Sequence, residues 1–412
     1  MRNAIFFLTI CTIISCKQQP NQSKNSLEQF YQVRDSLTDE LNQIYNRGHI
    51  YGFSVAIVNQ SETIYQNGFG FSDLQNNKEY NENSIQNIAS ISKTLIGIAL
   101  LKAQELGKLN LDDSISKYLS FDITNPYYPD SPITIRQLAT HTSTIIDTKY
   151  YDEKAYVLKE EKFIDIEGLS ETLNQPDMKI AMTDFLRAIL QKEGEWYQKD
   201  GFLKKKPGEQ FEYSNIGASL AALVLERATG KSYESFTTEH ILKPLKMSNS
   251  GWSFEDVNMY NHSKLYTKNE TELPYYSLIT FPDGGFITSA NDLALYLTEL
   301  IKGKLGEGTI LSHKSYRELF TLQLDETHFD ERDKEDKYND EYNSGIFMGF
   351  GGDGNIGHTG FDPGVATLMF FNPKTNVGKL LIINTTITSM DGLKEFYAIM
   401  DKLGEYEKKL NQ

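Results

Sequence analysis

Strand-like segments lie at both ends of this 412-residue chain, and helix-like or loop segments fill the middle. Near the N-terminus, residues 53–58 and 63–65 are predicted to form an antiparallel hairpin. Near the C-terminus, strands are predicted at 355–361, 365–371 and 379–384. The simplest fold that satisfies both ends is one antiparallel sheet assembled from the two termini, with a helical region inserted between them. We therefore expect an α+β fold, an α/β sandwich with an inserted helical region.

The predicted helices divide the chain further. They are expected at about 27–46, 90–107, 216–230, 291–303 and 390–404. Together with the strands, they indicate a sheet region over about 27–110 and 285–405, and a helical insert over about 111–284. We expect a cleft between these two parts.

The charge balance and the cysteine positions exclude several kinds of function. The chain has 41 basic and 56 acidic residues, so its net charge of −15 repels nucleic-acid phosphates. Both cysteines, Cys11 and Cys16, lie near the N-terminus, which leaves no disulfide, thiolate zinc site or cysteine nucleophile for the body of the chain. The seven histidines lack the spacing of a helical zinc site. We expect no nucleic-acid partner, no metal and no other cofactor.

The N-terminus is predicted to be an export signal. A positively charged start, an apolar run over residues 4–14 and the small residue Ser15 precede Cys16. An apolar helix of this length spans about 17 Å, well short of the roughly 30 Å of a bilayer core. A transmembrane anchor is therefore not expected here.

The sequence Ile-Ile-Ser-Cys that ends at Cys16 resembles the cleavage box of bacterial lipoproteins. The resemblance implies a signal peptide over 1–15, lipidation of Cys16, and a membrane-anchored protein in the periplasm or at the cell surface. A flexible tether over 16–26 and a folded domain over 27–412 would follow. The alternative is plain secretion with an incidental cysteine.

A serine and a lysine lie one helical turn apart at the start of the apolar helix predicted at 90–107. In Ser90-Ile-Ser-Lys93, the two end side chains share one helix face. The helix N-terminus adds free N–H groups and a positive dipole end near the Ser90 hydroxyl, which favour a developing oxyanion. The same four letters recur from Ser114 to Lys117, but no long apolar helix follows, so that copy is interpreted as structural.

Two further motifs follow in the chain. Tyr213-Ser-Asn215 lies just before a predicted helix and after a Pro-Gly-Glu turn. His358-Thr359-Gly360 lies on a predicted strand, where the glycine lets a substrate backbone approach the sheet edge. Taken alone, His358 would be interpreted as a structural histidine.

The three motifs, in this order, resemble those of the penicillin-binding protein and serine β-lactamase superfamily, which are Ser-x-x-Lys, Ser-x-Asn and Lys-Thr-Gly. Tyr213 replaces the middle serine, which resembles the class C β-lactamase and DD-carboxypeptidase branch. His358 replaces the third lysine, which resembles secreted DD-carboxypeptidases and D-aminopeptidase-like relatives. The resemblance covers nearly all of 28–404 and implies a β-lactamase/transpeptidase-like fold.

Some stretches depart from the family pattern. Residues 145–205 and 323–342 match poorly, and Thr144 stands where the family usually has glycine. These insertions are expected to reshape the cleft. The acidic stretch 325–341 and the lysines at 204–206 are expected to be solvated loops.

The resemblance assigns a role to each motif residue. Ser90 would be the nucleophile, and its backbone N–H and that of Phe361 would form the oxyanion hole. The substrate-binding residues would be Asn215, His358, Thr359 and Gly360. The general base would be Lys93, if about 4–5 kcal/mol of destabilisation of its ammonium keeps it neutral at pH 7, or Tyr213, if a charged Lys93 favours the phenolate. The sequence leaves both open.

The resemblance implies hydrolysis through a serine acyl-enzyme. The substrates would be D-amino-acid peptides, β-lactams or small esters, whose hydrolysis uses the same acylation residues but a different cleft shape. The alternative is a penicillin-binding-like lipoprotein that senses peptidoglycan or acts as a scaffold without turnover. We expect a small-molecule or peptide substrate as the partner, and contact with a membrane through a lipid anchor.

Overall fold

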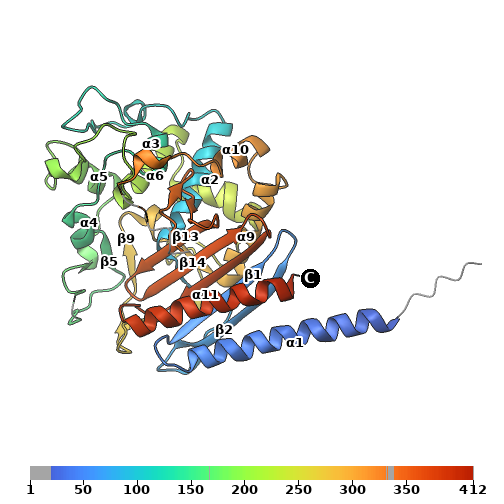
Figure 1. The fold of residues 1–412 in the computed structure, drawn as a ribbon. Helices are drawn as coiled ribbons and strands as arrows, with labels where there is room; N and C mark the ends of the chain where they lie inside the picture. Colours follow the sequence, from blue (N-terminus) through green and yellow to red (C-terminus); the bar gives the residue numbers. More distant parts are fainter. Residues whose placement is uncertain (1–19, 167, 331, 333–337, 412) are drawn as a thin grey trace, which may run out of the picture.

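The structure is a computed structural model that describes residues 20–411 apart from 167, 331 and 333–337. Its centre is an eight-stranded sheet with the strand order β11-β12-β13-β14-β15-β1-β2-β3. The strands are β1 (Gly52–Val58), β2 (Thr63–Asp73), β3 (Lys78–Glu79), β11 (Asn343–Ser344), β12 (Gly349–Phe350), β13 (Ile356–Asp362), β14 (Val365–Asn372) and β15 (Val377–Ile383). The C-terminal strand β15 pairs antiparallel with the N-terminal strand β1. The expected α+β fold, with one antiparallel sheet built from both termini, is confirmed (Figure 1).

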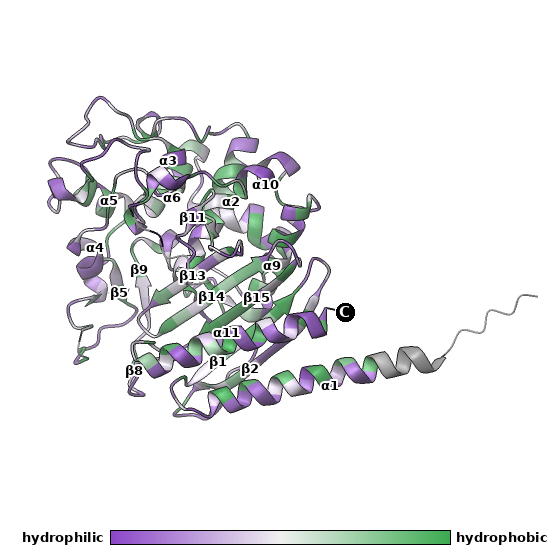
Figure 2. Cartoon of the chain, in the orientation of Figure 1, coloured by the Kyte–Doolittle hydropathy of each residue, from purple (hydrophilic) through white to green (hydrophobic). Residues whose placement is uncertain are grey.

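The two faces of the sheet bury different side chains, because successive strand residues point to opposite sides. The helices that cover the faces are α1 (Pro20–Tyr45), α9 (Ala290–Leu305) and α11 (Met390–Leu410). In β14, Leu368 and Phe370 pack in the core formed with α1 and α11, whereas Met369 and Phe371 pack in the core that includes α9. Figure 2 shows hydrophobic and hydrophilic residues alternating along α1 and α11, which lie against each other. The sheet therefore lies between two helical layers.

The helical region is built around α2 and α6, which are buried along most of their length. Its helices are α2 (Ser92–Glu105), α3 (Ile135–Ala139), α4 (Lys149–Lys154), α5 (Met182–Leu190), α6 (Asn215–Thr229), α7 (Tyr233–Thr237) and α8 (Lys243–Leu245). Helix α10 (His313–Leu319), from the C-terminal half of the chain, belongs to the same region. The 3₁₀ turn η1 (Ala89–Ile91) leads into α2.

The middle third is expected to be mainly helix and loop, but short strands occur in it and on either side of it. A small three-stranded sheet has the order β6-β5-β9, and two further pairs are β10-β4 and β7-β8. These strands are β4 (Ile85–Asn87), β5 (Tyr156–Leu158), β6 (Leu173–Asn174), β7 (Leu265–Tyr266), β8 (Glu272–Leu273), β9 (Tyr276–Leu278) and β10 (Ile287–Ser289). Each has only two or three residues, which is too short for a clear alternation of polar and apolar positions.

Helix α1 begins at Pro20, within the stretch 16–26 that the sequence predicts to be a flexible tether. Proline suits the first turn of a helix because its missing N–H would have no partner there. The predicted signal peptide and Cys16 lie outside the described residues. Among the helices that are described, none is long and apolar enough to cross a membrane.

Thr144 adopts a left-handed backbone conformation, with φ at +73°. This conformation explains the glycine that the family usually has at this position, because a Cβ makes it costly. The Thr144 side chain is buried and accepts a hydrogen bond from Asn125 Nδ2 over 2.8 Å. The hydrogen bond offsets part of the backbone strain.

Thr144→Ala is expected to destabilise the protein more than Thr144→Gly, by about 1 kcal/mol. Alanine loses the hydrogen bond from Asn125 and keeps the strained backbone, whereas glycine loses the same bond and relieves the strain. Urea unfolding of the two variants beside the parent protein measures the difference. A glycine variant that is less stable than the alanine variant would show that strain at this position is negligible.

Candidate active site

Ser90 and Lys93 come together at the start of helix α2. The turn η1 carries Ser90, and Lys93 lies one turn further on. Lys93 Nζ donates to Ser90 Oγ over 3.0 Å and to the backbone carbonyl of Asp283 over 2.8 Å. The Lys93 side chain is completely buried, whereas Ser90 is half-buried. A buried amine thus lies against a hydroxyl that a substrate can reach.

Strand β13 contacts the backbone beside Ser90. A Cβ atom at Gly360 would lie 2.6 Å from the carbonyl oxygen of Ile88 and 3.0 Å from the backbone nitrogen of Ser90. Ala89, between them, has φ at +47°, a conformation that costs about 1–2 kcal/mol for a residue with a Cβ. The sequence assigns Gly360 to the approach of a substrate, but the structure shows that the Ser90 segment of the same chain needs this space.

The two N–H groups assigned to the oxyanion hole belong to segments that pack on each other. The backbone nitrogen of Ser90 packs on Gly360, the residue before Phe361. Thr359 N–H donates to Asp340, which shows that it points away from β14. Directions alternate along a strand, so Phe361 N–H points to the same edge of β13 as Thr359 N–H. The backbone segments of Ser90 and Phe361 are therefore neighbours.

Tyr213 lies beside both groups. Lys93 Nζ is 5.0 Å from the centre of the Tyr213 ring, and the Tyr213 side chain contacts Ser90. The ring stacks on His141, with centroids 4.6 Å apart and 24° between the planes. His141 Nδ1 accepts the backbone N–H of Ser214 over 3.1 Å. His141 therefore positions Tyr213, a role that no spacing in the sequence indicates.

Burial moves the pKa values of Lys93 and Tyr213 in opposite directions. It lowers the pKa of Lys93 from its usual value, and the carboxylates of Asp283 and Asp147 act against this change. Burial raises the pKa of Tyr213 well above its usual value, and the contact with Ser90 acts against that change. Both directions favour a neutral amine beside a neutral phenol. The arrangement therefore suits Lys93 as the proton acceptor and Tyr213 as a donor.

Asn215 is held by Asp147, which the motifs do not include. Asn215 Nδ2 donates to Asp147 Oδ2 over 2.7 Å, and the backbone N–H groups of Asn215 and Ile216 donate to the same carboxylate over 3.0 and 2.9 Å. The Asp147 carboxylate thus satisfies the N-terminus of α6 and fixes the Asn215 amide. The hydrogen bonds of the described residues include none between Asn215 and Lys93.

The third motif binds a carboxylate of the same chain. Asp340 Oδ2 accepts the backbone N–H of Thr359 over 2.6 Å and lies 2.8 Å from His358 Nδ1. The Asp340 side chain is only 9% exposed. The expectation of a solvated loop over 325–341 is therefore wrong at Asp340, because His358 and Thr359 supply the donors that a buried carboxylate needs.

Two more buried carboxylates border the site. Asp283 accepts the Tyr151 hydroxyl over 3.0 Å and the Ser219 hydroxyl over 2.8 Å, and burial raises its pKa to about 6. Asp362, at the end of β13, accepts the Tyr156 hydroxyl over 2.6 Å, and burial raises its pKa to about 7. Nothing in the sequence marks Asp283 or Asp362 as buried.

The second Ser-Ile-Ser-Lys copy has a different environment. Ser114 Oγ lies 2.8 Å from Ser116 Oγ, and Lys117 Nζ pairs with Asp113 over 2.8 Å. The Lys117 side chain is 59% exposed. An exposed, paired lysine keeps its charge and does not act as a base, which supports the structural interpretation of this copy.

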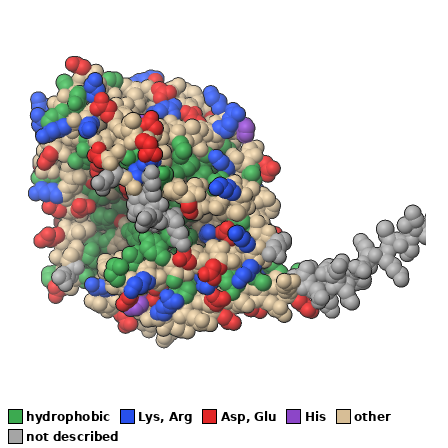
Figure 3. Space-filling view, in the orientation of Figure 1, with side chains coloured by type: hydrophobic (Ala, Val, Ile, Leu, Met, Phe, Trp, Pro, Cys, Tyr) green, Lys and Arg blue, Asp and Glu red, His purple; other side chains and the backbone are tan. Residues whose placement is uncertain are grey.

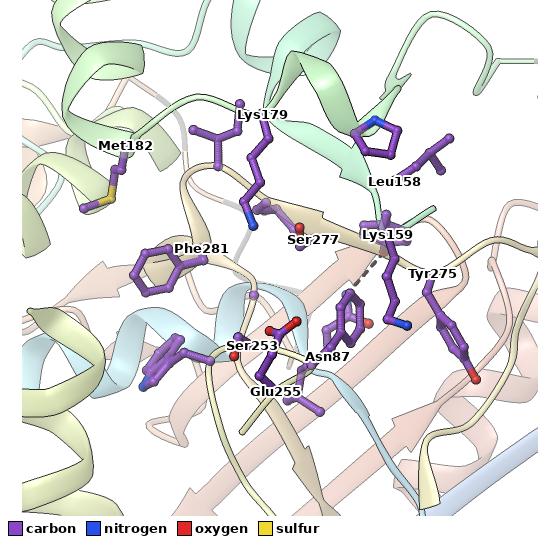
Figure 4. A pocket seen from close by; sticks show the side chains of 18 of the residues that line it. Asn87, Leu158, Lys159, Lys179, Met182, Ser253, Glu255, Tyr275, Ser277 and Phe281 are labelled. Atoms are coloured by element: carbon purple, nitrogen blue, oxygen red, sulfur yellow. Dashed lines mark hydrogen bonds between the residues drawn. The ribbon is translucent and has the colours of Figure 1, made fainter. Parts of the chain in front are cut away.

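A separate pocket of about 360 Å³ lies near the Ser90 segment (Figure 4). Its aromatic walls are Trp252, Phe254, Tyr275, Tyr276 and Phe281. Asn87, three residues before Ser90, lines it, but no residue of the three motifs does. The surface in Figure 3 is hollowed in the region where Figure 1 places β9 and β13, with hydrophobic side chains on its floor. The pocket in Figure 4 is thus a neighbour of the motif cluster and not its centre.

Comparison with known sequences gives long matches. A sequence model of the β-lactamase family matches residues 34–403. Protein flp of Staphylococcus aureus (strain MW2) is 30% identical over 253 residues, which cover 60% of this chain and 45% of that protein. The mitochondrial serine beta-lactamase-like protein LACTB of Mus musculus is 27% identical over 327 residues, which cover 66% of this chain and 58% of that protein. The chain spans about half the length of these relatives.

Solved structures share the fold at lower identity. The octameric penicillin-binding protein homologue from Pyrococcus abyssi matches with a TM-score of 0.69 and 24% identity, over 90% of this chain and 77% of that chain. D-amino acid amidase from Ochrobactrum anthropi SV3 matches with a TM-score of 0.68 and 20% identity, over 92% and 100%. A class C beta-lactamase matches with a TM-score of 0.64 and 19% identity, over 90% and 96%.

The family match covers most of the chain, and the fold of these structures is the one observed here. The resemblance inferred from the three motifs is therefore confirmed: the chain belongs to the β-lactamase family, within the superfamily of serine β-lactamases and penicillin-binding proteins.

Proposed function

We propose that this protein hydrolyses amide or ester bonds through an acyl-enzyme on Ser90. The observation that carries the proposal is the 3.0 Å hydrogen bond between Lys93 Nζ and Ser90 Oγ, made by an amine whose pKa is lowered by burial. An amine in this position takes the hydroxyl proton as the oxygen attacks a carbonyl carbon. The family match supports a serine hydrolase.

Acylation exchanges one bond and moves one proton. Ser90 Oγ bonds to the carbonyl carbon while its proton passes to Lys93. The carbonyl oxygen becomes an oxyanion and accepts the N–H groups of Ser90 and Phe361, each of which contributes about 3–4 kcal/mol of transition-state stabilisation. The bond to the leaving group then breaks, and the leaving nitrogen or oxygen receives the proton from Lys93 through the Tyr213 hydroxyl.

Water completes the cycle. A water molecule attacks the acyl carbon and gives one proton to Lys93, which returns it to Ser90 Oγ as the acyl bond breaks. The products are a carboxylic acid and the free enzyme. Asn215, fixed by Asp147 through its Nδ2, presents its Oδ1 to an N–H of the substrate in this proposal.

The proposed substrates are D-amino-acid peptides or amides, β-lactams and small esters. The fold is shared with D-amino acid amidase from Ochrobactrum anthropi SV3 and with a beta-lactamase/D-alanine carboxypeptidase from Yersinia pestis, which supports this range. The alternative is a binding protein without turnover. The contacts that join Ser90, Lys93 and Tyr213 favour the enzyme.

We expect Ser90 to be acylated and Ser114 to remain unmodified. Incubation with a fluorescent penicillin or a fluorophosphonate, followed by peptide mass mapping, should give one adduct on Ser90. Ser90→Ala should abolish labelling, whereas Ser114→Ala should leave it within about twofold, because that copy is exposed and its Lys117 is paired with Asp113. Labelling that survives Ser90→Ala, or no labelling and no turnover of esters and cephalosporins, would favour the binding protein.

Ester hydrolysis is expected to accelerate with rising pH as Lys93 loses its proton. Because burial lowers the pKa of Lys93, the midpoint of the rise in kcat/KM should lie below the ordinary lysine value of about 10.4. Tyr213→Phe should keep this rise and lower kcat by about 10²-fold, the usual effect of a lost proton donor. A pH rise that disappears in Tyr213→Phe and remains in Lys93→Met would identify the tyrosinate as the base.

We also propose that the chain is an exported lipoprotein, anchored through Cys16 in the periplasm or at the cell surface. The charged start, the apolar run and the lipoprotein-like box before Cys16 support this. In a bacterial host, the protein should fractionate with membranes, incorporate labelled palmitate and lack residues 1–15 by mass. Cys16→Ser should prevent the incorporation. Soluble, unlabelled wild-type protein outside the cytoplasm would indicate plain secretion instead.

A further inference from the structure

We propose that the subsite beside His358 and Thr359 takes an ammonium or uncharged group of the substrate and excludes a carboxylate, because the carboxylate of Asp340 already occupies its anion-binding donors. The inference rests on the proposed acyl-enzyme function and specifies its substrate class. Amides or esters that carry an amine are favoured over peptides and β-lactams that carry a carboxylate at this subsite.

Asp340 takes up the donors of the third motif. Its Oδ2 accepts the backbone N–H of Thr359 over 2.6 Å and the Thr359 hydroxyl over 3.1 Å, and it lies 2.8 Å from His358 Nδ1. Its Oδ1 lies 3.2 Å from the same hydroxyl. The same His358 nitrogen lies 2.6 Å from the Thr359 carbonyl oxygen. A carboxylate on the substrate would find these donors already engaged and a negative charge in its place.

Asp340 is fixed to the sheet. Its side chain is 9% exposed, and a Cβ at Gly349 of β12 would lie 2.6 Å from the Asp340 carbonyl oxygen. Two residues earlier, Tyr338 is buried, stacks on Tyr397 with centroids 5.4 Å apart, and donates to Asp401 Oδ1 over 2.9 Å. The carboxylate is therefore part of the wall of the site.

Asp340 also shortens the free edge of β13. Gly357 is opposite Gly349 of β12, and Thr359 N–H donates to Asp340. Phe361 is the next residue whose N–H points to this edge. A substrate backbone that approaches Ser90 therefore meets the Phe361 N–H, and it cannot extend along Thr359 as an added strand.

The charges around the site favour a cation. The titratable groups that line the hollow beside Asp340 include Asp340, Glu341, His141 and His358. The buried Lys93 interacts with the carboxylates of Asp283, Asp147 and Asp362 as well as with Asp340. The small hollow beside Asp340 is also lined by the rings of Phe211, Tyr213 and Phe347. Carboxylates and aromatic faces are the groups that attract an ammonium ion.

The test compares thioesters that share one acyl group, N-acetyl-D-alanine, and differ in the charge of the leaving thiol. The thiols are mercaptoacetate, mercaptoethanol and thiocholine, whose quaternary nitrogen carries the positive charge and cannot take the acyl group from sulfur, and their release is followed with a chromogenic disulfide. The ammonium thioester should have a kcat/KM at least about 10-fold above that of the carboxylate thioester. Asp340→Asn should reduce this ratio about 10-fold, because it removes the negative charge and keeps the side-chain shape.

A second pair varies the acyl side. D-alanyl and N-succinyl-D-alanyl thioesters of mercaptoethanol place an amine or a carboxylate there and show which end of the substrate reaches Asp340. A preference for the amine at either end, lost in Asp340→Asn, supports the proposal. Equal or faster turnover of the carboxylate substrate at both ends, or a preference that survives Asp340→Asn, overturns it.

Asp325→Asn is the matched control. Asp325 belongs to the same acidic stretch, but its side chain is 72% exposed, so the ratio should change less than about twofold. Labelling of Ser90 with the fluorophosphonate, which carries no carboxylate, reports the acylation-competent fraction of each variant. Wild-type protein that is not labelled refutes the proposed function, whereas labelled protein without an amine preference refutes this inference alone. If Asp340→Asn does not fold, the wild-type protein decides through its ratio of kcat/KM for the ammonium thioester to kcat/KM for the carboxylate thioester. A ratio above about threefold supports the proposal, and a smaller ratio overturns it.

Discussion

The burial of one amine organises the site. Lys93 is completely buried, and its Nζ has two acceptors, the Ser90 hydroxyl and the carbonyl of Asp283, which lies 190 positions further along the chain. A buried ammonium or amine without partners costs several kcal/mol, so the start of α2 and the Asp283 segment have to meet in one arrangement. The contact that stabilises the packing of the helical region is thus also the one that prepares the nucleophile.

A second constraint is the backbone contact between β13 and the Ser90 segment. Gly360 leaves room for the Ile88 carbonyl and the Ser90 nitrogen, and Ala89 takes a strained conformation beside them. The proposed oxyanion donors are backbone groups of these two segments, so their positions depend on the sheet and the helix rather than on mobile side chains. Groups fixed in this way need no reorganisation as charge develops on the substrate.

Local patterns predicted much of this structure, and long-range contacts account for what they missed. Alternation along the terminal strands and the apolar run of α2 are visible in the sequence, and so is the spacing of the three motifs. The carboxylates are different: Asp147 reaches Asn215 across 68 positions, and Asp340 reaches Thr359 from a stretch whose acidity indicates a solvated loop. Among 56 acidic residues, only the folded packing decides which ones are buried beside donors.

Asp340 shows that a motif can retain most of its letters while its partner changes. Thr359 and Gly360 follow the family sequence, yet the carboxylate that Thr359 binds comes from the chain itself. The acylation groups Ser90 and Lys93 make their hydrogen bonds to each other and to Asp283, whereas Asp340 bonds to the third motif. In the proposed function, acyl transfer and substrate selection therefore depend on separate side chains, so a loop beside a sheet edge can change the preferred charge of the substrate while the nucleophile keeps its surroundings.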